Sequence, residues 1–339
     1  MEWVRGETIG HGTFSTVTLA TPTNNVSGEF PQVMAVKSAD SHGAASLANE
    51  KCVLDKLGDD CDEIVRCFGE DRTVENGEEI HNLFLEYASR GSLANGEGLP
   101  EATVRRYTGS VLRGLRHIHA KGFAHCDLKL GNILLFGDGA VKIADFGLAR
   151  EVTALKDGGV EIRGTPLYMA PESVNDNMYG SEADVWALGC AVVEMFSGET
   201  AWSFKEGSHF MSLLIRIGVG EEVPRIPVDL SEQGRDFLTK CFVKDPKKRW
   251  TAEMLLSHPF LAVDLDHDDF EQEEEVVSQL KTEDVFTSPR CPFEFPNWVS
   301  ASSDSTQYHP FDSLEERVAT LVTDLNPDWS VTNNWVVVR

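Results

Sequence analysis

The sequence contains few cysteines and no long hydrophobic run. Its seven cysteines form no Cys-x-x-Cys pair, which argues against a zinc site, and their odd number argues against a disulfide framework. The longest apolar stretch, residues 185–193, is far shorter than the roughly 20 residues of a membrane-spanning helix. No apolar run follows a basic start, so we expect no secretory signal. These absences favour the cytosol or nucleus, with reduced thiols and no membrane partner.

Basic residues are scarce as well, because 30 Lys and Arg stand against 55 Asp and Glu, a net charge of −25. Nucleic acid is therefore not expected as a partner, since its phosphates would be repelled. The acidic excess is uneven, because residues 262–339 hold 17 acidic and 4 basic side chains, half of the whole excess. This shift in composition predicts a boundary near Leu261, with a folded domain before it and an acidic C-terminal tail after it.

The acidic tail, residues 262–339, combines charge runs with a short amphipathic pattern. Residues 264–275 are strongly acidic, which predicts a solvated, disordered segment. Apolar residues then recur at helical spacing and two tryptophans follow: Leu314, Val318, Leu321, Leu325, Trp329 and Trp335. We hold two hypotheses for this tail: a docking surface, for a regulator or for the chain's own folded domain, or a plain flexible extension.

The folded part changes from a strand pattern to a helix pattern. Alternating apolar positions predict a hairpin over residues 3–20, with Gly10 and Gly12 at its turn. Further elements are expected as strands at 33–38, 64–70 and 81–86, a hairpin loop at 74–79 and a helix at 44–57. From Pro100 to Gly122 apolar residues fall at steps of three and four, which predicts a long helix. Strands followed by helices indicate an α+β fold of two lobes with a cleft between them.

Three polar residues share one short segment after the predicted long helix. Asp127, Lys129 and Asn132 have the spacing Asp-x-Lys-x-x-Asn, and Asp145 follows 13 residues after Asn132 in an Asp-Phe-Gly triplet. These groups are the parts of a phosphoryl-transfer site: a base for a hydroxyl, a cation for the γ-phosphate, and two oxygen ligands for Mg²⁺. Because about six fixed residues sit at fixed spacing, a chance match is roughly one in many thousands. The pattern resembles the catalytic half of a protein kinase.

A glycine-rich segment lies at the turn of the first predicted hairpin. It runs Ile9-Gly10-His11-Gly12-Thr13-Phe14-Ser15-Thr16-Val17, and its glycines would let a hairpin backbone close over phosphates without a Cβ in the way. Alone, the motif fits a plain β-turn better. A dinucleotide-binding loop would pass from strand to helix, whereas residues 16–20 have a strand pattern. Ser15 replaces the third glycine, and its small side chain is expected to be tolerated.

Lys37 ends the predicted strand at 33–38 in an apolar setting. An isolated buried ammonium is costly, so it needs an anion. Glu50, 13 residues later on the predicted helix, is the candidate partner, and the pair would hold the α- and β-phosphates of a nucleotide. The alternative is that both residues lie on the surface; the motifs downstream favour the pair.

Taken together, these motifs resemble those of a eukaryotic protein kinase over residues 3–261. The resemblance implies a bilobal fold with a β-rich N-lobe, about residues 3–86, and a mainly α-helical C-lobe, about residues 89–261. It implies ATP as the phosphoryl donor and Mg²⁺ as the metal. In this family Asp127 would orient the substrate hydroxyl and accept its proton. Lys129 would steady the γ-phosphate, and Asn132 and Asp145 would bind the metal.

The resemblance also assigns residues around the nucleotide and along the C-lobe. Val17, Ala35 and Leu134 would clasp adenine. Leu85 stands at the gatekeeper position, followed by Glu86 and Ala88, whose backbone groups would face adenine. The remaining landmarks are a hydrophobic spine of Leu54, His125 and Phe146, an ion pair of Glu172 with Arg249, and Asp184 on the helix that anchors the catalytic loop.

Two details narrow the class. Lys129, two residues after Asp127, is typical of Ser/Thr kinases, and residues 164–172 are similar to those of the sterile-type kinases of MAP kinase cascades. Trp3 near the start and the final segment, residues 335–339, are similar to short plant MEKK-type MAP kinase kinase kinases. The resemblance implies MAP kinase kinases as protein substrates. Two alternatives stay open: another signalling Ser/Thr kinase, and a pseudokinase scaffold, which the presence of Lys37 and Asp127 disfavours.

Cys126 departs from the family pattern, because most protein kinases have arginine at this position. That arginine binds the phosphorylated activation loop, and a thiol cannot form such a charge-assisted pair. We therefore hypothesise that activity depends little on phosphorylation of the activation segment, in which Thr153 and Thr165 are the candidate hydroxyls. Thr165 is expected to shape the substrate pocket and to bond near Asp127. Cys126 itself is expected to be a packing residue, with a reactive thiol as the alternative.

Overall fold

The computed structural model describes residues 2–12, 15–23, 30–94, 97–152, 162–203 and 210–262. Thr13, Phe14 and Thr153 lie outside these described residues, as does nearly all of the predicted acidic tail. Among the described residues, no helix is both long enough and apolar enough to cross a bilayer.

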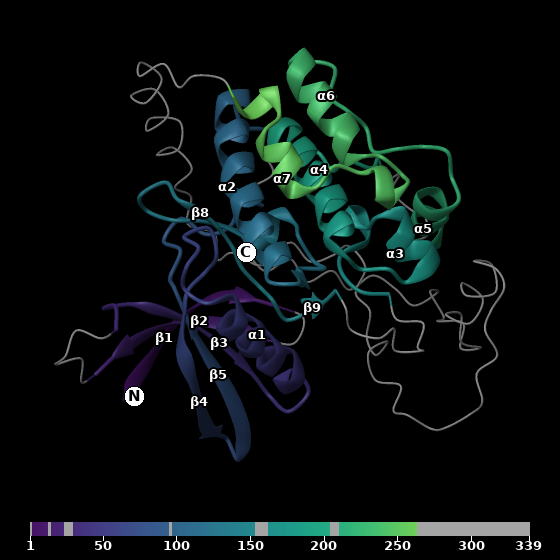
Figure 1. Ribbon diagram of the computed structural model, residues 1–339. Coiled ribbons are helices and arrows are strands. Elements are labelled where there is room, and N and C mark those ends of the chain that lie inside the picture. Colours follow the sequence, from purple (N-terminus) through teal and green to yellow (C-terminus); the bar gives the residue numbers. More distant parts are fainter. Residues whose placement is uncertain are drawn as a thin grey trace, which may run out of the picture. The chain divides into compact units, whose positions relative to one another are not determined.

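The N-terminal part is a five-stranded antiparallel sheet with the strand order β1-β2-β3-β5-β4 (Figure 1). Its strands are β1 (Trp3–His11), β2 (Thr16–Pro22), β3 (Met34–Ala39), β4 (Cys67–Glu75) and β5 (Glu78–Leu85). Ala20, Met34, Val36 and Phe84 form a buried cluster of this sheet. Trp3 packs edge-on against Phe84, with 5.1 Å between ring centroids. The predicted first hairpin is confirmed.

Helix α1 (Ala44–Leu57) has the predicted bounds. Four apolar residues on one face are buried, and Glu50 is buried among them. A charged residue in this position needs a partner inside the fold, because its carboxylate has lost its water. The helix ends at Gly58, whose φ of +73° suits glycine.

The predicted loop at residues 74–79 is wrong, because β4 and β5 continue through most of it. Only Asn76 and Gly77 turn the chain, with φ values of +53° and +89°. Two successive residues with positive φ form the tight hairpin turn that Asn-Gly favours. The acidic residues beside the turn are exposed, so they can extend the strands into solvent without burying charge. Strand β4 also begins later than predicted, at Cys67.

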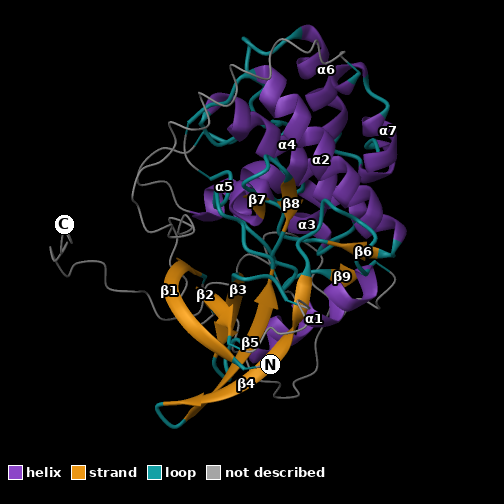
Figure 2. Cartoon of the chain, turned by 90° about the vertical axis from the view of Figure 1, so that its left-hand side faces the viewer, coloured by secondary structure: helices purple, strands orange, loops and turns teal. Residues whose placement is uncertain are grey.

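The C-terminal part is mainly helical (Figure 2). Its helices are α2 (Glu101–Ala120), α3 (Pro171–Asp176), α4 (Ser181–Ser197), α5 (Phe210–Gly218), α6 (Glu232–Cys241) and α7 (Ala252–Leu256). Short strand pairs join β6 (Phe123–Ala124) to β9 (Arg150–Glu151), and β7 (Ile133–Leu135) to β8 (Val141–Ile143). Pro100 precedes α2, and Gly122 follows it with a φ of +81°, which confirms the predicted long helix.

Helix α4 lies at the centre of this helical part, because residues on all its sides are buried. It packs against α2 and α6, and Trp186 on it contacts Phe242 with 5.3 Å between ring centroids. The observed architecture, a β-rich lobe followed by a helical lobe, confirms the predicted bilobal α+β fold.

Candidate active site

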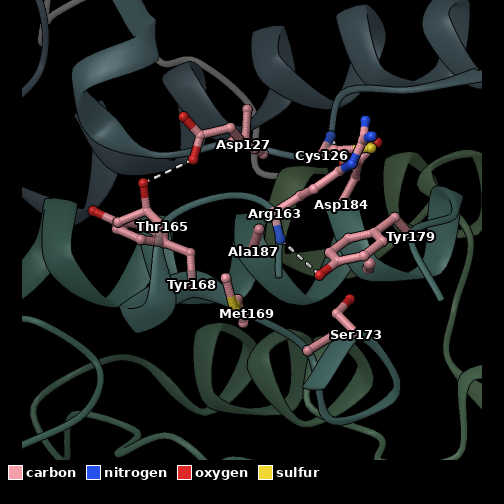
Figure 3. Close-up of a pocket in the computed structure, with 13 residues that line it drawn as sticks. Cys126, Asp127, Arg163, Thr165, Tyr168, Met169, Ser173, Tyr179, Asp184 and Ala187 are labelled. Carbon is pink, nitrogen blue, oxygen red and sulfur yellow. Dashed lines mark hydrogen bonds between the residues drawn. The ribbon is translucent and has the colours of Figure 1, made fainter. Parts of the chain in front are cut away.

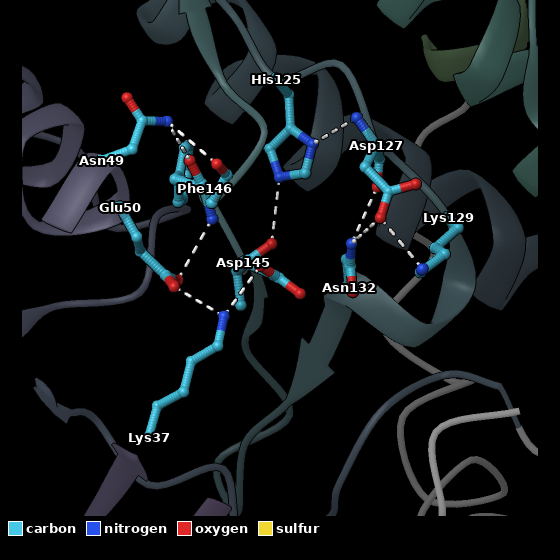
Figure 4. Close-up of polar contacts among 11 residues, drawn as sticks. Lys37, Asn49, Glu50, His125, Asp127, Lys129, Asn132, Asp145 and Phe146 are labelled. Carbon is cyan, nitrogen blue, oxygen red and sulfur yellow. Dashed lines mark hydrogen bonds and ion pairs between the residues drawn. The ribbon is translucent and has the colours of Figure 1, made fainter. Parts of the chain in front are cut away.

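Three charged residues meet where β3, α1 and the segment after β8 come together (Figure 4). The Nζ of Lys37 lies 2.6 Å from the Oε2 of Glu50 and 2.8 Å from the Oδ1 of Asp145. Burial alone would lower the pKa of Lys37, but the two carboxylates outweigh it and raise this pKa. Lys37 therefore stays an ammonium inside the fold, and its pairing with Glu50 rules out the alternative of two surface residues.

Asp145 has the geometry of a functional residue. Its φ of +64° is uncommon for a residue with a side chain, and its side chain is 45% exposed. Burial opposes its ionisation, yet the ammonium of Lys37 lowers the pKa of Asp145 to about 2. The carboxylate is thus an anion at neutral pH that still faces solvent.

Asn132, in a short turn before β7, lies beside the catalytic base candidate. Its side-chain amide donates to the carbonyl oxygen of Asp127 at 2.8 Å and to the Oδ2 of Asp127 at 3.2 Å. Both donated bonds use the nitrogen, so the amide oxygen remains as a possible metal ligand. No group of three or more His, Cys, Asp and Glu among the described residues could hold a metal alone. Asn132 and Asp145 therefore fit a magnesium ion that takes its other ligands from phosphates and water.

The carboxylate of Asp127 is held by two further side chains. The hydroxyl of Thr165 donates to its Oδ1 at 2.7 Å, and the Nζ of Lys129 lies 3.0 Å from its Oδ2. Lys129 also donates to the Thr165 hydroxyl at 3.0 Å. These three contacts fasten Asp127 of the catalytic loop to Thr165, which lies in the segment that begins at Ile162. Thr165 therefore bonds near Asp127, as the sequence predicted.

The backbone of the catalytic loop is fastened to helix α4. The buried carboxylate of Asp184 accepts hydrogen bonds from the amides of His125 and Cys126, at 2.8 and 2.9 Å. His119 on α2 contacts the same carboxylate at 2.9 Å through its Nε2. These bonds hold Cys126 at a φ of +68°, a strained value for a non-glycine residue.

The predicted spine residues are all buried, and two of them are in contact. The rings of His125 and Phe146 meet edge to face at 4.9 Å between centroids, and the Nε2 of His125 lies 3.0 Å from the carbonyl oxygen of Ala144. Leu54 is buried on α1. These contacts tie the Asp-Phe-Gly segment to the catalytic loop.

Asn49 is a functional candidate that sequence reasoning missed. Its side-chain amide donates to the carbonyl oxygens of Phe146, Gly147 and Ala149 at 3.3, 3.0 and 2.9 Å. The amide of Phe146 in turn donates to the Oε1 of Glu50 at 3.1 Å. Helix α1 thus binds the Asp-Phe-Gly segment through two consecutive residues. Only the position of Asn49 next to Glu50 could have signalled this role.

The residues predicted around adenine come from three places in the chain. Ile9, Gly10 and His11 belong to β1, Thr16 and Val17 to β2, and Ala35 pairs with Leu85 between β3 and β5. Gly12 and Ser15 form the turn, in which the Gly12 amide donates to the Ser15 carbonyl oxygen at 2.7 Å. Leu134 lies on β7. Thr13 and Phe14, at the tip, are outside the described residues.

Glu86 has more contacts than the sequence suggested. Its amide donates to the carbonyl oxygen of Arg66 at 2.9 Å, and its carboxylate pairs with the Nζ of Lys142 at 2.8 Å. The backbone group of Glu86 that can serve adenine is therefore its carbonyl oxygen. The carbonyl oxygen of Ala88 accepts from the Gly91 amide at 3.1 Å, which leaves the Ala88 amide as the group for adenine. Lys142 is a second residue that sequence reasoning missed.

The end of the activation segment is anchored by a buried ion pair. The guanidinium of Arg249 contacts both carboxylate oxygens of Glu172, at 2.5 and 2.9 Å, and its side chain is fully buried. It also donates to the carbonyl oxygen of Glu182 at 2.6 Å. The expected pair of Glu172 and Arg249 is present.

A narrow pocket lies between the catalytic loop and the segment that begins at Ile162 (Figure 3). Cys126, Asp127, Arg163 and Thr165 line it. Burial raises the pKa of the Cys126 thiol well above its ordinary value, and the thiol donates to the Ala124 carbonyl oxygen at 3.5 Å. A neutral, bonded thiol favours the packing interpretation of Cys126 over a reactive nucleophile.

Comparison with known proteins agrees with this geometry. Residues 3–261 match the family described as protein kinase domain. The chain is 69% identical to mitogen-activated protein kinase kinase kinase 20 of Arabidopsis thaliana, over the full length of both proteins. It is 41% and 37% identical to kinases 18 and 17 of the same series and organism. These two matches cover 77% of this chain and 78% and 70% of the relatives.

The family match and the full-length relative agree with the observed ion pairs of Lys37 with Glu50 and of Lys129 with Asp127. The two alternatives, a pseudokinase scaffold and another signalling Ser/Thr kinase, are not favoured. The chain belongs to the protein kinase family, as a serine/threonine kinase of the plant mitogen-activated protein kinase kinase kinase group.

Proposed function

We propose that the chain transfers the γ-phosphoryl group of ATP to serine or threonine hydroxyls of MAP kinase kinases. The observation that carries the proposal is one site that joins two clusters: Lys37 with Glu50 and Asp145, and Asp127 with Lys129 and Thr165. The substrate class is supported by relatives that are named as MAP kinase kinase kinases.

Asp127 is the residue proposed to act on the substrate hydroxyl. Thr165 and Lys129 each bind one of its carboxylate oxygens, so the carboxylate has one orientation toward an incoming hydroxyl. It would orient that hydroxyl and accept its proton as the new O–P bond forms. Lys129 would at the same time neutralise negative charge on the transferred group.

Lys37 and Glu50 are proposed to position the nucleotide phosphates. The ammonium of Lys37 is already held by two carboxylates, so little side-chain entropy is lost when phosphates bind. Asn132 and Asp145 would hold Mg²⁺, which when bound neutralises phosphate charge in the transition state. The half-exposed carboxylate of Asp145 supports this assignment.

Three wider proposals follow from composition. The net charge of −25 supports the absence of nucleic-acid and anionic membrane partners. Residues 262–339 are proposed to contact a regulator or the chain's own kinase domain, supported by the apolar residues at helical spacing. A cytoplasmic or nuclear location is proposed from the absence of a secretory pattern.

Transfer of labelled phosphate from ATP tests the proposed activity. The purified full chain is incubated with catalytically inactive MAP kinase kinases and with a generic protein substrate, and Lys37→Met serves as the matched inactive control. We expect strong labelling of at least one MAP kinase kinase. Labelling of the generic substrate alone would contradict the proposed substrate class. No labelling of any protein by the wild-type chain would contradict the proposed kinase activity.

Replacement of the metal tests the choice of Mg²⁺. We expect activity with Mg²⁺ after removal of divalent ions by a chelator, and little with Ca²⁺, which prefers more ligands and a looser geometry. Equal activity with both ions would contradict the magnesium assignment.

A further inference from the structure

Cys126 has no charge, yet the charges of two arginines, Arg150 and Arg163, act on its thiol. Arg150 lies on β9, in register with Ala124 on β6, two residues before Cys126. Arg163 lines the same pocket as Cys126. In Figure 3 the side chain of Arg163 extends from its amide toward the thiol of Cys126. Positive charge reaches this point from the activation segment, and not from the catalytic loop.

The backbone around Arg163 is pressed against the catalytic loop. Gly164 has a φ of +87°, and a Cβ at this position would lie 2.5 Å from the carbonyl oxygen of Cys126. The amide of Arg163 donates to the hydroxyl of Tyr179 at 2.8 Å. Two residues after Arg163, Thr165 binds Asp127. Residues 163–165 and the pair Cys126 and Asp127 therefore act as one contact surface, in which a shift of either segment moves the catalytic carboxylate.

The pocket is lined by charges of both signs. The carboxylates of Asp127 and Asp184 line the pocket together with Arg163, and the field of Arg150 and Arg163 is felt at the buried thiol, where it opposes the rise in the pKa of Cys126. An arginine at position 126 would add a second guanidinium to a pocket that Arg163 already lines. Like charges in one pocket repel strongly where water is scarce, so the activation segment would then need an anion to stay in place.

We propose that Arg163 is a positioning residue that holds the substrate-binding segment against the catalytic loop, and that the uncharged Cys126 is what leaves room for its guanidinium. The segment thus carries its own cation and needs no phosphate at this point. This inference rests on the kinase activity of the chain but not on the identity of its protein substrate.

A double-mutant cycle in the full chain tests the pairing. The variants are Arg163→Met, Cys126→Arg and the two combined, and each is assayed on a generic protein substrate. We expect Arg163→Met to raise KM for the protein substrate about tenfold and to leave KM for ATP within about twofold, because the residue lines the pocket beside Asp127 and Thr165 and not the cluster around Lys37. Arg163→Lys keeps the charge and should retain most of the activity. A merely structural role would move both KM values together.

The cycle is expected to be non-additive. Cys126→Arg should lower kcat/KM about tenfold through repulsion, Cys126→Met should lower it less, and the double variant should be more active than Cys126→Arg alone. Arg225→Met, which removes an exposed guanidinium paired with Glu199 at 3.3 Å, serves as the control for lost charge and should change nothing. Independent effects of the two substitutions, within about twofold, would overturn the proposal.

Two measurements keep the result interpretable. The first is thermal unfolding of each variant. If Cys126→Arg does not fold, Arg163→Glu is compared with Arg163→Lys. A lower KM for the protein substrate in the lysine variant supports the proposal, and equal KM values overturn it. The second is labelling of MAP kinase kinases by the wild-type chain. If only the generic substrate is labelled, the proposed substrate is contradicted, but the double-mutant cycle can still be measured on the generic substrate.

Discussion

The two sides of the active site are held together in different ways. On the nucleotide side, ion pairs join residues of separate lobes, because Lys37 and Glu50 come from β3 and α1 whereas Asp145 follows β8 in the helical part. On the substrate side, Asp127, Lys129 and Thr165 all belong to the helical part and bind one another directly.

This difference indicates which side depends on the arrangement of the lobes. The substrate side is assembled inside one lobe, where α4 and the pair of Glu172 and Arg249 fix its segments. The nucleotide side exists only while α1 stays against the Asp-Phe-Gly segment, through Asn49 and Glu50. We therefore expect changes of helix α1 to alter nucleotide affinity, and changes around Asp127 to alter turnover.

The largest effect is expected for Asp127→Asn. Loss of the proton acceptor should lower kcat by a factor on the order of 10² to 10⁴ and leave KM for ATP nearly unchanged, because Asp127 acts on the hydroxyl. Steady-state kinetics with varied ATP measure both quantities. A variant that keeps most of its kcat would show that Asp127 is not the catalytic base.

Breaking the buried ion pair is expected to be the next largest effect. Arg249→Met leaves the carboxylate of Glu172 buried without its partner, which costs about 3–5 kcal/mol of unfolding free energy. Urea unfolding measures this loss. Glu172→Gln combined with Arg249→Met removes both charges and should recover part of the stability; no recovery would mean that the pair acts through packing alone.

A smaller effect is expected for Asn49→Ala on the nucleotide side. Three carbonyl oxygens lose a hydrogen-bond donor, so we expect the Asp-Phe-Gly segment to lose about 1–3 kcal/mol of stabilisation. This loss should appear as a raised KM for ATP with little change in KM for the protein substrate. Lys51→Ala, on the same helix and paired with Asp55 at its surface, is the matched control. An equal rise in both KM values would contradict the separation of the two sides.

The smallest effect is expected for Thr153→Ala, a residue outside the described part of the chain. Without an arginine at position 126, a phosphate on Thr153 has lost its usual charge-assisted partner, so activity should change by less than about twofold. Kinase assays before and after phosphatase treatment check this. A near-complete loss that follows the phosphate on Thr153 would contradict the hypothesis.

Much of the fold could be predicted because its signals are local. The bounds of α1 follow from apolar spacing and Gly58, and the hairpin at the start follows from strand alternation around two glycines. The extent of β4 and β5 could not be predicted in this way. Their acidic ends look like a loop, but the Asn76-Gly77 turn and the pairing of the strands hold them in the sheet.

The candidate site could be predicted only in part, because only some of its residues belong to local motifs. Motif spacing predicted Lys37, Glu50, Asp127 and Asp145 as residues of one site, since that spacing is typical of phosphoryl-transfer sites. Asn49, His119 and Lys142 were not identified, because their partners lie between 56 and 100 residues away in the chain. Ordinary polar residues acquire such roles only through the folded arrangement.

By itself the sequence determined the chemistry: which groups can donate, accept, bind a metal or carry charge, and that a thiol replaces arginine at position 126. Only the tertiary structure decided which of these groups meet. Lys37 and Asp145 are brought to 2.8 Å from 108 residues apart, and Arg163 is carried to the side of Cys126. The physical reason is that ion pairs and hydrogen bonds act over a few ångströms, so their partners depend on how helices and strands pack and not on the order of the residues in the chain.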